Sequence, residues 1–142
     1  MRKWSFGEAS KDRLATCHPD LIAVAMLALE YSYGDFAIAC GHRGQAEQDA
    51  AFNAGRSEKR WPTGNHNASP SNALDFMPWP DPFPKKETLK QRQRWYSIAG
   101  AFYAASVALG IPLRFGMDWD GDRDLTDQTF DDLGHVELVK GG

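Results

Sequence analysis

The sequence lacks several features that would place it in a specialised class of protein. It has only two cysteines among 142 residues, Cys17 and Cys40, and no CxxC spacing, so neither a disulfide scaffold nor a cysteine-based zinc site is expected. Free cysteines of this kind are usually buried. The longest apolar run, 21–29, is far shorter than the roughly 20 residues that a membrane-spanning helix needs. Because no secretory signal precedes it, we expect synthesis in the cytoplasm without membrane insertion.

The chain also lacks the positive charge of most nucleic-acid-binding domains. Its formal net charge is −3, so no nucleic-acid partner is expected. Hydrophobic residues make up 42% and charged residues 25%, which is typical of a folded protein. The length predicts a single domain over residues 1–142, and a monomer is the simplest expectation.

The charge is distributed unevenly along the sequence. Residues 118–132 hold seven aspartates and one arginine, a formal charge of −6, whereas basic residues cluster at 56–60 and 85–94. A modestly basic body is suited to contact with an anionic polymer such as the bacterial wall, although ordinary solvated surface charge is the simpler explanation for each cluster.

Hydrophobic periodicity predicts helices that alternate with short strands. Helical spacing predicts helices at 10–17, 19–31, 45–54 and 86–109, with Ser10 as the cap of the first. Short apolar or alternating segments predict strands at 36–40, 73–77, 113–115 and 135–139. The segments 56–72 and 78–84 are rich in loop-forming residues and are expected to be irregular. This order predicts an α+β fold with a small, mainly antiparallel sheet and helices packed on it.

Two histidines and one aspartate are candidate metal ligands. His66 and His135 lie beside polar turns that flank predicted strands. Asp75 projects from the strand 73–77 on the face opposite to Leu74 and Phe76. Three protein ligands with one open coordination position are typical of a catalytic zinc site, although this spacing by itself is a weak signal.

Three further charged residues fit a hydrolytic site. Asp132 precedes His135 by three residues, where a carboxylate that is not a ligand can accept a proton from water. Arg43 follows the first strand and is suited to stabilising an oxyanion or holding a substrate carboxylate, with a surface ion pair as the equally simple alternative. Glu137 shares a strand face with His135, either as its hydrogen-bond partner or as a cross-strand charge partner.

The acidic stretch suggests a second ion. Hard oxygen ligands at alternating spacing suit Ca²⁺, with a solvated acidic loop as the alternative. The residues concerned are Asp118, Asp120, Asp122, Asp124 and Asp127. No glycine occupies the position that an EF-hand loop requires. The remaining histidines, His18 and His42, fit neither ion site; His18 is expected to be either a surface residue or a contact at the start of a helix.

Several runs of this sequence resemble the VanY-type zinc peptidases. Within that group they are most similar to the phage L-alanyl-D-glutamate endopeptidases, and the likeness extends from about residue 10 to 139. The runs are GHR at 41–43, GNH at 64–66 with ALDF at 73–76, RFGMDW at 114–119, and DLGHVEL at 132–138. One departure is the spacing: the family has six residues between its His and Asp, whereas eight separate His66 from Asp75, and Asn65 precedes the histidine.

This resemblance implies a hedgehog/D-Ala-D-Ala-peptidase-like fold and a zinc site. Its ligands would be His66, Asp75 and His135, with Asp132 as general base and Arg43 in the substrate site. Trp119, like Glu137, is a candidate for contact with the ligands or the substrate. The implied function is that of an endolysin, which cuts the L-alanyl-D-glutamate bond of peptidoglycan stem peptides to lyse the host.

Further expectations concern how the protein acts. Without a signal peptide or a separate wall-binding domain, it would reach the wall from the host cytoplasm through a holin-type membrane hole. Alternative functions are a D-Ala-D-Ala carboxypeptidase with the same metal centre, and a wall-binding or phage structural module without catalysis. A cysteine peptidase using Cys40 is disfavoured, because Cys40 ends a strand instead of beginning a helix.

Overall fold

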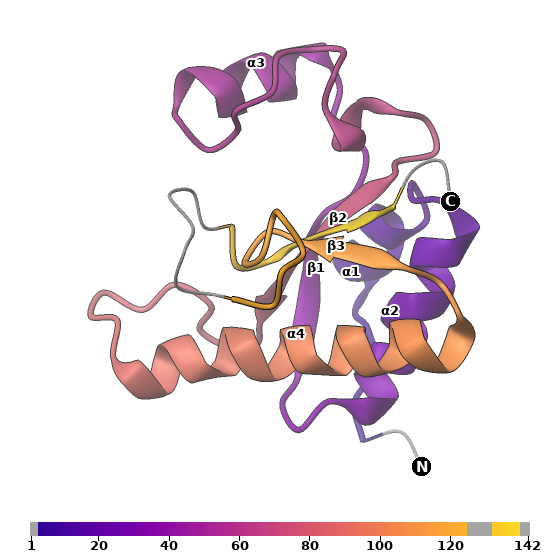
Figure 1. Cartoon of the computed structure of the whole chain (residues 1–142). Coiled ribbons are helices and arrows are strands. Elements are labelled where there is room, and N and C mark those ends of the chain that lie inside the picture. Colours follow the sequence, from indigo (N-terminus) through magenta and orange to yellow (C-terminus); the bar gives the residue numbers. More distant parts are fainter. Residues whose placement is uncertain (1–2, 125–131, 140–142) are drawn as a thin grey trace.

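A four-stranded antiparallel sheet forms the centre of the computed structural model, which describes residues 3–124 and 132–139 (Figure 1). The strand order is β1 (Phe36–Cys40), β2 (Ala73–Pro78), β4 (His135–Leu138) and β3 (Leu113–Phe115). The helices are α1 (Glu8–Leu14), α2 (Pro19–Tyr31), α3 (Gln45–Asn53) and α4 (Leu89–Leu109), with a 3₁₀ turn at Asn65–Asn67. The predicted α+β fold with an antiparallel sheet is therefore confirmed.

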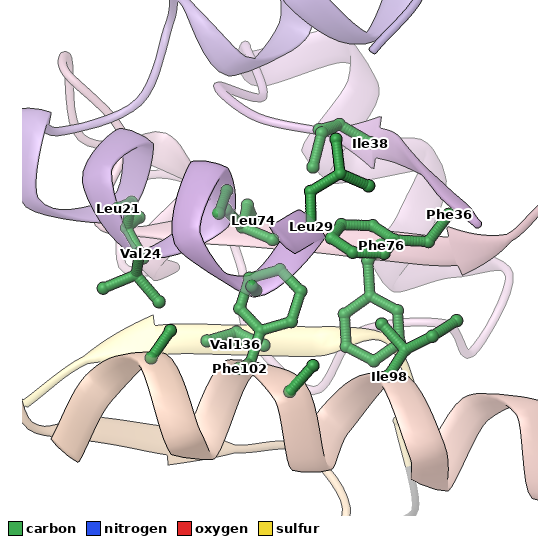
Figure 2. Packing of buried hydrophobic residues seen from close by; sticks show 14 of the residues in the cluster. Leu21, Val24, Leu29, Phe36, Ile38, Leu74, Phe76, Ile98, Phe102 and Val136 are labelled. Carbon is green, nitrogen blue, oxygen red and sulfur yellow. The ribbon is translucent and has the colours of Figure 1, made fainter. Parts of the chain in front are cut away.

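One face of the sheet packs against α2 and α4. Leu74 and Phe76 of β2 point to this face and are fully buried, as their alternation with Asp75 predicts. Figure 2 shows them meeting side chains of both helices. The ring of Phe102 in α4 stacks on Phe76 with centroids 5.1 Å apart, and it lies 5.3 Å from the ring of Phe36. This core fixes the sheet, and the opposite face carries Asp75.

Two helices begin at different residues from those predicted. α1 begins at Glu8, and Ser10 lies inside it, where its buried hydroxyl accepts a hydrogen bond from the backbone N–H of Ile38 at 3.0 Å. Ser10 is therefore a link from α1 to the sheet instead of a cap. α4 begins at Leu89 because Thr88 caps it, accepting from the backbone N–H of Gln91. Within the described ranges, no helix combines the length and apolar character that crossing a bilayer requires.

The long loop at 56–72 is anchored to the rest of the fold near its end. The backbone N–H of Ser71 donates to the carbonyl of Thr16 at 2.9 Å, and the N–H of His18 donates back to Ser71 at 2.8 Å. Asn72 closes the loop on itself by donating to the carbonyl of Asn65 at 3.0 Å. These bonds hold the 3₁₀ turn that contains His66 beside the sheet.

Candidate metal centre and cleft

The three predicted ligands meet on the face of the sheet opposite the core. Asp75 and His135 lie directly across from each other in β2 and β4, and His66 reaches them from the 3₁₀ turn. Asp75 Oδ1 is 3.2 Å from both His66 Nε2 and His135 Nδ1, and the two nitrogens are 3.3 Å apart. Both imidazoles are buried. Three potential ligand atoms thus form a nearly equilateral triangle.

This triangle has the size that a tetrahedral zinc ion requires. With zinc–ligand bonds of about 2.0–2.1 Å, the ligand atoms of a tetrahedral site lie about 3.3 Å apart. The observed separations of 3.2, 3.2 and 3.3 Å match that edge length. Two imidazole nitrogens and a carboxylate oxygen are also a donor set that zinc prefers. The residues present therefore fit a single zinc ion.

Each imidazole is oriented by a partner on its far side. His66 Nδ1 lies 2.7 Å from the carbonyl oxygen of Gly41, and His135 Nε2 lies 2.8 Å from Glu137 Oε1. Since both partners are acceptors, these ring nitrogens carry the protons. The other nitrogen of each ring faces Asp75, where it can bind a metal ion once it has released its proton.

Glu137 is itself held by two donors. Asn65 Nδ2 donates to Glu137 Oε2 at 2.7 Å, and Arg114 Nη2 lies 3.0 Å from the same oxygen. Burial by itself would raise the pKa of Glu137. The hydrogen bond and positive charge of His135 outweigh this effect, with smaller contributions from Asn65 and Arg114, so the pKa of Glu137 is lowered. The carboxylate behind His135 is therefore kept ionised.

The electrostatics of the three ligand residues are dominated by mutual attraction. Burial disfavours charge on His66, but the Asp75 carboxylate more than offsets it and raises the pKa of His66 to about 10. The pKa of His135 is raised in the same way, against its burial, chiefly by its hydrogen bond to Asp75. Burial also opposes ionisation of Asp75, yet the two imidazoles hold its pKa well below the usual range. Positive charge is strongly favoured at this point of the sheet.

Asp132 lies beside this cluster and outside the triangle. Its Oδ2 is 3.8 Å from His135 Nδ1, and its side chain is about one-third exposed. The backbone N–H of Asp132 donates to the carbonyl of Gly116. A Cβ at position 116 would clash with the Asp132 carbonyl oxygen, so only glycine lets the two backbone segments come this close. Burial and the nearby Asp75 carboxylate raise the pKa of Asp132 to about 6. A carboxyl that titrates near neutrality is suited to accepting and returning a proton.

Arg43 forms an ion pair with the predicted ligand Asp75. Its Nη2 lies 3.5 Å from Asp75 Oδ2, and its Nη1 donates to Gln48 Oε1 at 3.0 Å. The side chain is only 14% exposed, so this is not the surface ion pair that the sequence left as an alternative. Sequence reasoning missed Gln48, a fully buried amide on α3 that also bonds Lys59, because nothing in its local pattern distinguishes it from a surface residue.

An open cleft of about 790 Å³ leads to the cluster. Its walls come from the loop after α3, from α4 and the segment before it, from the sheet face, and from the segment after β3; they include Arg56, Lys59, Phe83, Trp95, Arg114 and Trp119. The ring of Trp119 lies 5.0 Å from that of His135, centroid to centroid. Trp95, predicted only as a core residue of α4, is partly buried and also lines this cleft.

The other histidines and the cysteines play different parts. His18 caps α2 by accepting from the N–H of Asp20, which agrees with the helix contact predicted for it. His42 Nδ1 lies 2.9 Å from the carbonyl of Ala68, away from the cluster. Cys17 is buried as predicted, whereas Cys40 is only partly buried, with its Sγ 3.9 Å from His66 Nδ1. The expectation of two buried thiols is therefore wrong for Cys40, which pairs with Asp75 in the sheet and shares its face, opposite the core.

The acidic stretch brings three of its carboxylates together. Asp118, Asp120 and Asp122 can each offer an oxygen within 4.8 Å of the others. Within the described chain, Asp118 Oδ1 is buried without a hydrogen-bond partner. Asp124 is not part of this group, and Asp127 lies outside the described residues.

A His–Asp–His triangle, a neighbouring carboxylate and an open cleft are together the features of a metal-dependent hydrolase. Comparison with known proteins gives the family. The family model of the phage L-alanyl-D-glutamate peptidases matches residues 2–139. The L-alanyl-D-glutamate peptidase of Escherichia phage T5 is 36% identical over 140 residues, covering 96% of this chain and 98% of that protein. This chain therefore belongs to the phage L-alanyl-D-glutamate peptidase family, as its sequence motifs predicted.

A solved structure agrees with this assignment. The crystal structure of the Serratia marcescens L-Ala-D-Glu endopeptidase ChiX superposes with a TM-score of 0.71 at 27% identity. The match covers 96% of this chain and 92% of that one. The peptidase fold predicted from the sequence motifs is thereby confirmed.

Proposed function

We propose that this protein is a zinc-dependent endopeptidase that hydrolyses the L-alanyl-D-glutamate bond of peptidoglycan stem peptides. Membership of the family supports the L-alanyl-D-glutamate bond as the bond that is cleaved, since both relatives are named for this activity. The observation that carries the zinc assignment is the triangle of ligand atoms with edges of 3.2–3.3 Å. The cleft that opens onto this triangle supports a peptide substrate over a free amino acid.

In the proposed mechanism, the chain's own residues bind, orient and move protons. Zinc held by His66, Asp75 and His135 would supply Lewis-acid chemistry, which polarises a carbonyl group and acidifies water. Asp132 Oδ2 accepts the proton of the attacking water and returns it to the leaving amine. Arg43, kept in place by its contacts with Gln48 and Asp75, stabilises the negative charge that develops on the scissile carbonyl oxygen.

Calcium is proposed as a second ion at the acidic stretch. The support is the grouping of Asp118, Asp120 and Asp122 and the buried, unpaired Oδ1 of Asp118 in the described chain. Because Trp119 lies in this segment and against His135, an ordered loop would act on the zinc site. Terbium luminescence sensitised by Trp119 and competed by calcium tests binding, and an assay with zinc retained but calcium removed tests the effect on turnover. Unchanged activity and no terbium signal would remove calcium from the account.

We also propose that the protein acts at the cell wall, because its proposed substrate is peptidoglycan. A peptidoglycan peptidase made in the host cytoplasm must cross the inner membrane to meet the wall, and a holin-type hole would provide the passage. Fractionation of infected cells before and after membrane permeabilisation tests this route. Lysis in the absence of any membrane lesion would contradict it.

A cysteine mechanism is not supported by the geometry around Cys40. His66 Nδ1 is 3.9 Å from Cys40 Sγ but 2.7 Å from the carbonyl of Gly41, so this nitrogen donates its proton and is not a base for the thiol. Alkylation would place bulk against His66, so Cys40→Ala is the cleaner test. We expect this variant to keep its activity and its zinc.

Mass spectrometry of digested muropeptides separates the proposed function from its alternatives. We expect products in which alanine is separated from glutamate. Release of terminal D-alanine alone would identify a D-Ala-D-Ala carboxypeptidase. Peptidoglycan binding by the zinc-loaded protein without any cleavage would identify a wall-binding module.

A further inference from the structure

One arginine of the cleft has a hydrogen-bonding edge that the proposed mechanism does not use. In the sheet, Asp75 pairs with His135, and Arg114 pairs with Glu137. Because paired residues and alternate residues share a face, Arg114 extends the row of charged side chains from the metal ligands to the edge strand β3. It lines the cleft with 44% of its side chain exposed.

The guanidinium of Arg114 is fixed in orientation. Its Nε and Nη2 lie 3.2 and 3.0 Å from Glu137 Oε2, which uses one edge of the planar group. Its Cζ lies 5.3 Å from the ring centroid of Trp119, which restrains the plane. A guanidinium carries five N–H donors, so among the described residues the edge formed by Nη1 and the second N–H of Nη2 is left for another acceptor, and a carboxylate can bind there with two parallel hydrogen bonds.

Arg43 is less suited to the same task. Its side chain is 14% exposed, and its two Nη atoms already contact Gln48, Cys40 and Asp75. The positive charge of Arg43 is balanced by the carboxylate of Asp75, which is itself a predicted metal ligand. Arg114 lies beside the candidate metal ligands, since its partner Glu137 contacts His135, and it lines the cleft that leads to them.

The proposed substrate carries a free carboxylate next to the bond that is cleaved. A D-glutamate residue has two carboxyl groups, and only one can continue the peptide, so the other is a free carboxylate close to the scissile amide. Bringing this carboxylate into a partly buried cleft costs free energy unless a hydrogen-bonding cation meets it. We infer that Arg114 binds the free carboxylate of the substrate's D-glutamate and thereby selects it over the amidated residue; this inference rests on the proposed function.

Two synthetic peptides test the inference with the zinc-loaded enzyme. Both contain the L-alanyl-D-glutamyl bond, and they differ only in whether the free carboxyl is a carboxylate or a primary amide. We expect the wild type to prefer the carboxylate by about 10- to 100-fold in kcat/KM. The difference should lie in KM, because the contact is the same in the ground state and the transition state.

Arg114→Met should reduce this preference, because KM for the carboxylate peptide should rise more than KM for the amide peptide. Arg60→Met is the matched control, because Arg60 is exposed, stacks on Phe52 and lies outside the cleft lining; its preference should match the wild type. Zinc content is measured for each variant, since Arg114 also holds Glu137. If Arg114→Met has lost zinc, Arg114→Gln decides at full zinc content, because its amide can still donate to Glu137 but carries no charge: a reduced preference supports the inference, and an unchanged one overturns it.

The outcomes distinguish this inference from the proposed function. Equal cleavage of both peptides by the wild type would leave the peptidase intact and overturn the role of Arg114. A parallel loss of activity on both peptides in zinc-loaded Arg114→Met would show that Arg114 serves only to hold Glu137. Cleavage of neither peptide by the wild type would refute the proposed function itself.

Discussion

The clearest consequence of the site geometry concerns Asp132, whose proposed role is to move a proton without binding the metal. Its Oδ2 lies 3.8 Å from His135 Nδ1, outside the triangle of ligand atoms at 3.2–3.3 Å. Asp132→Asn keeps the size of the side chain and its backbone hydrogen bonds but replaces the proton acceptor with an amide. We therefore expect zinc to remain bound while turnover falls.

The expected fall in turnover of Asp132→Asn can be estimated from the contribution of general acid–base catalysis. A positioned general acid–base group contributes about 10²- to 10⁴-fold to the rate, which corresponds to about 3–5 kcal/mol of activation free energy. The loss should appear in kcat, with KM changed little, because the carboxylate acts in the transition state. Substrate contacts elsewhere in the cleft are unaffected by the substitution.

The assay combines steady-state cleavage of a stem peptide with metal analysis of the same samples. Asp12→Asn is the control, since Asp12 is exposed on α1 and is not part of the cleft lining, and it should behave as wild type. Activity of zinc-loaded Asp132→Asn within about threefold of wild type would refute the proton-transfer role. Loss of zinc from this variant would show instead that Asp132 is a ligand.

Three further predictions concern the ligands, the core and the thiols. His66→Ala should lose zinc and activity, whereas His42→Ala should keep both, because His42 Nδ1 faces the Ala68 carbonyl and not the Asp75 cluster; equal zinc in the two variants contradicts the ligand assignment. Phe102→Ala should lower the free energy of unfolding by about 3–5 kcal/mol in urea titrations, because it removes a fully buried ring, while Val107→Ala, 64% exposed, should change it by less than about 1 kcal/mol. Burial raises the pKa of Cys17 to about 11, so a thiol reagent at pH 8 should modify one thiol in the native protein and two after denaturation; two fast-reacting thiols in the native state would show that Cys17 is accessible.

The sequence was most informative where one local rule decides the structure. Strand alternation placed Asp75 opposite the buried pair Leu74 and Phe76, and the structure agrees because the core buries one whole face of β2. Helix starts were less accurate, because a cap such as Thr88 outweighs the helix-forming residues before α4.

Contacts between distant segments could not be predicted in the same way. The bond from Asn65 to Glu137 joins residues 72 positions apart, and the buried amide of Gln48 depends on a loop folding over α3. The two additional residues between His66 and Asp75 are accommodated because hydrogen bonds from Ser71 and Asn72 anchor the loop. Only the tertiary structure specifies such partners, and they orient the residues that the motifs predict to be metal ligands.

X-ray absorption spectroscopy of the zinc-loaded protein tests the central claim most directly. We predict a first shell of nitrogen and oxygen atoms at about 2.0–2.1 Å that includes two imidazoles, from His66 and His135, and a carboxylate from Asp75. A sulfur ligand at about 2.3 Å, which would come from Cys40, or a shell with fewer than two imidazoles would contradict the account.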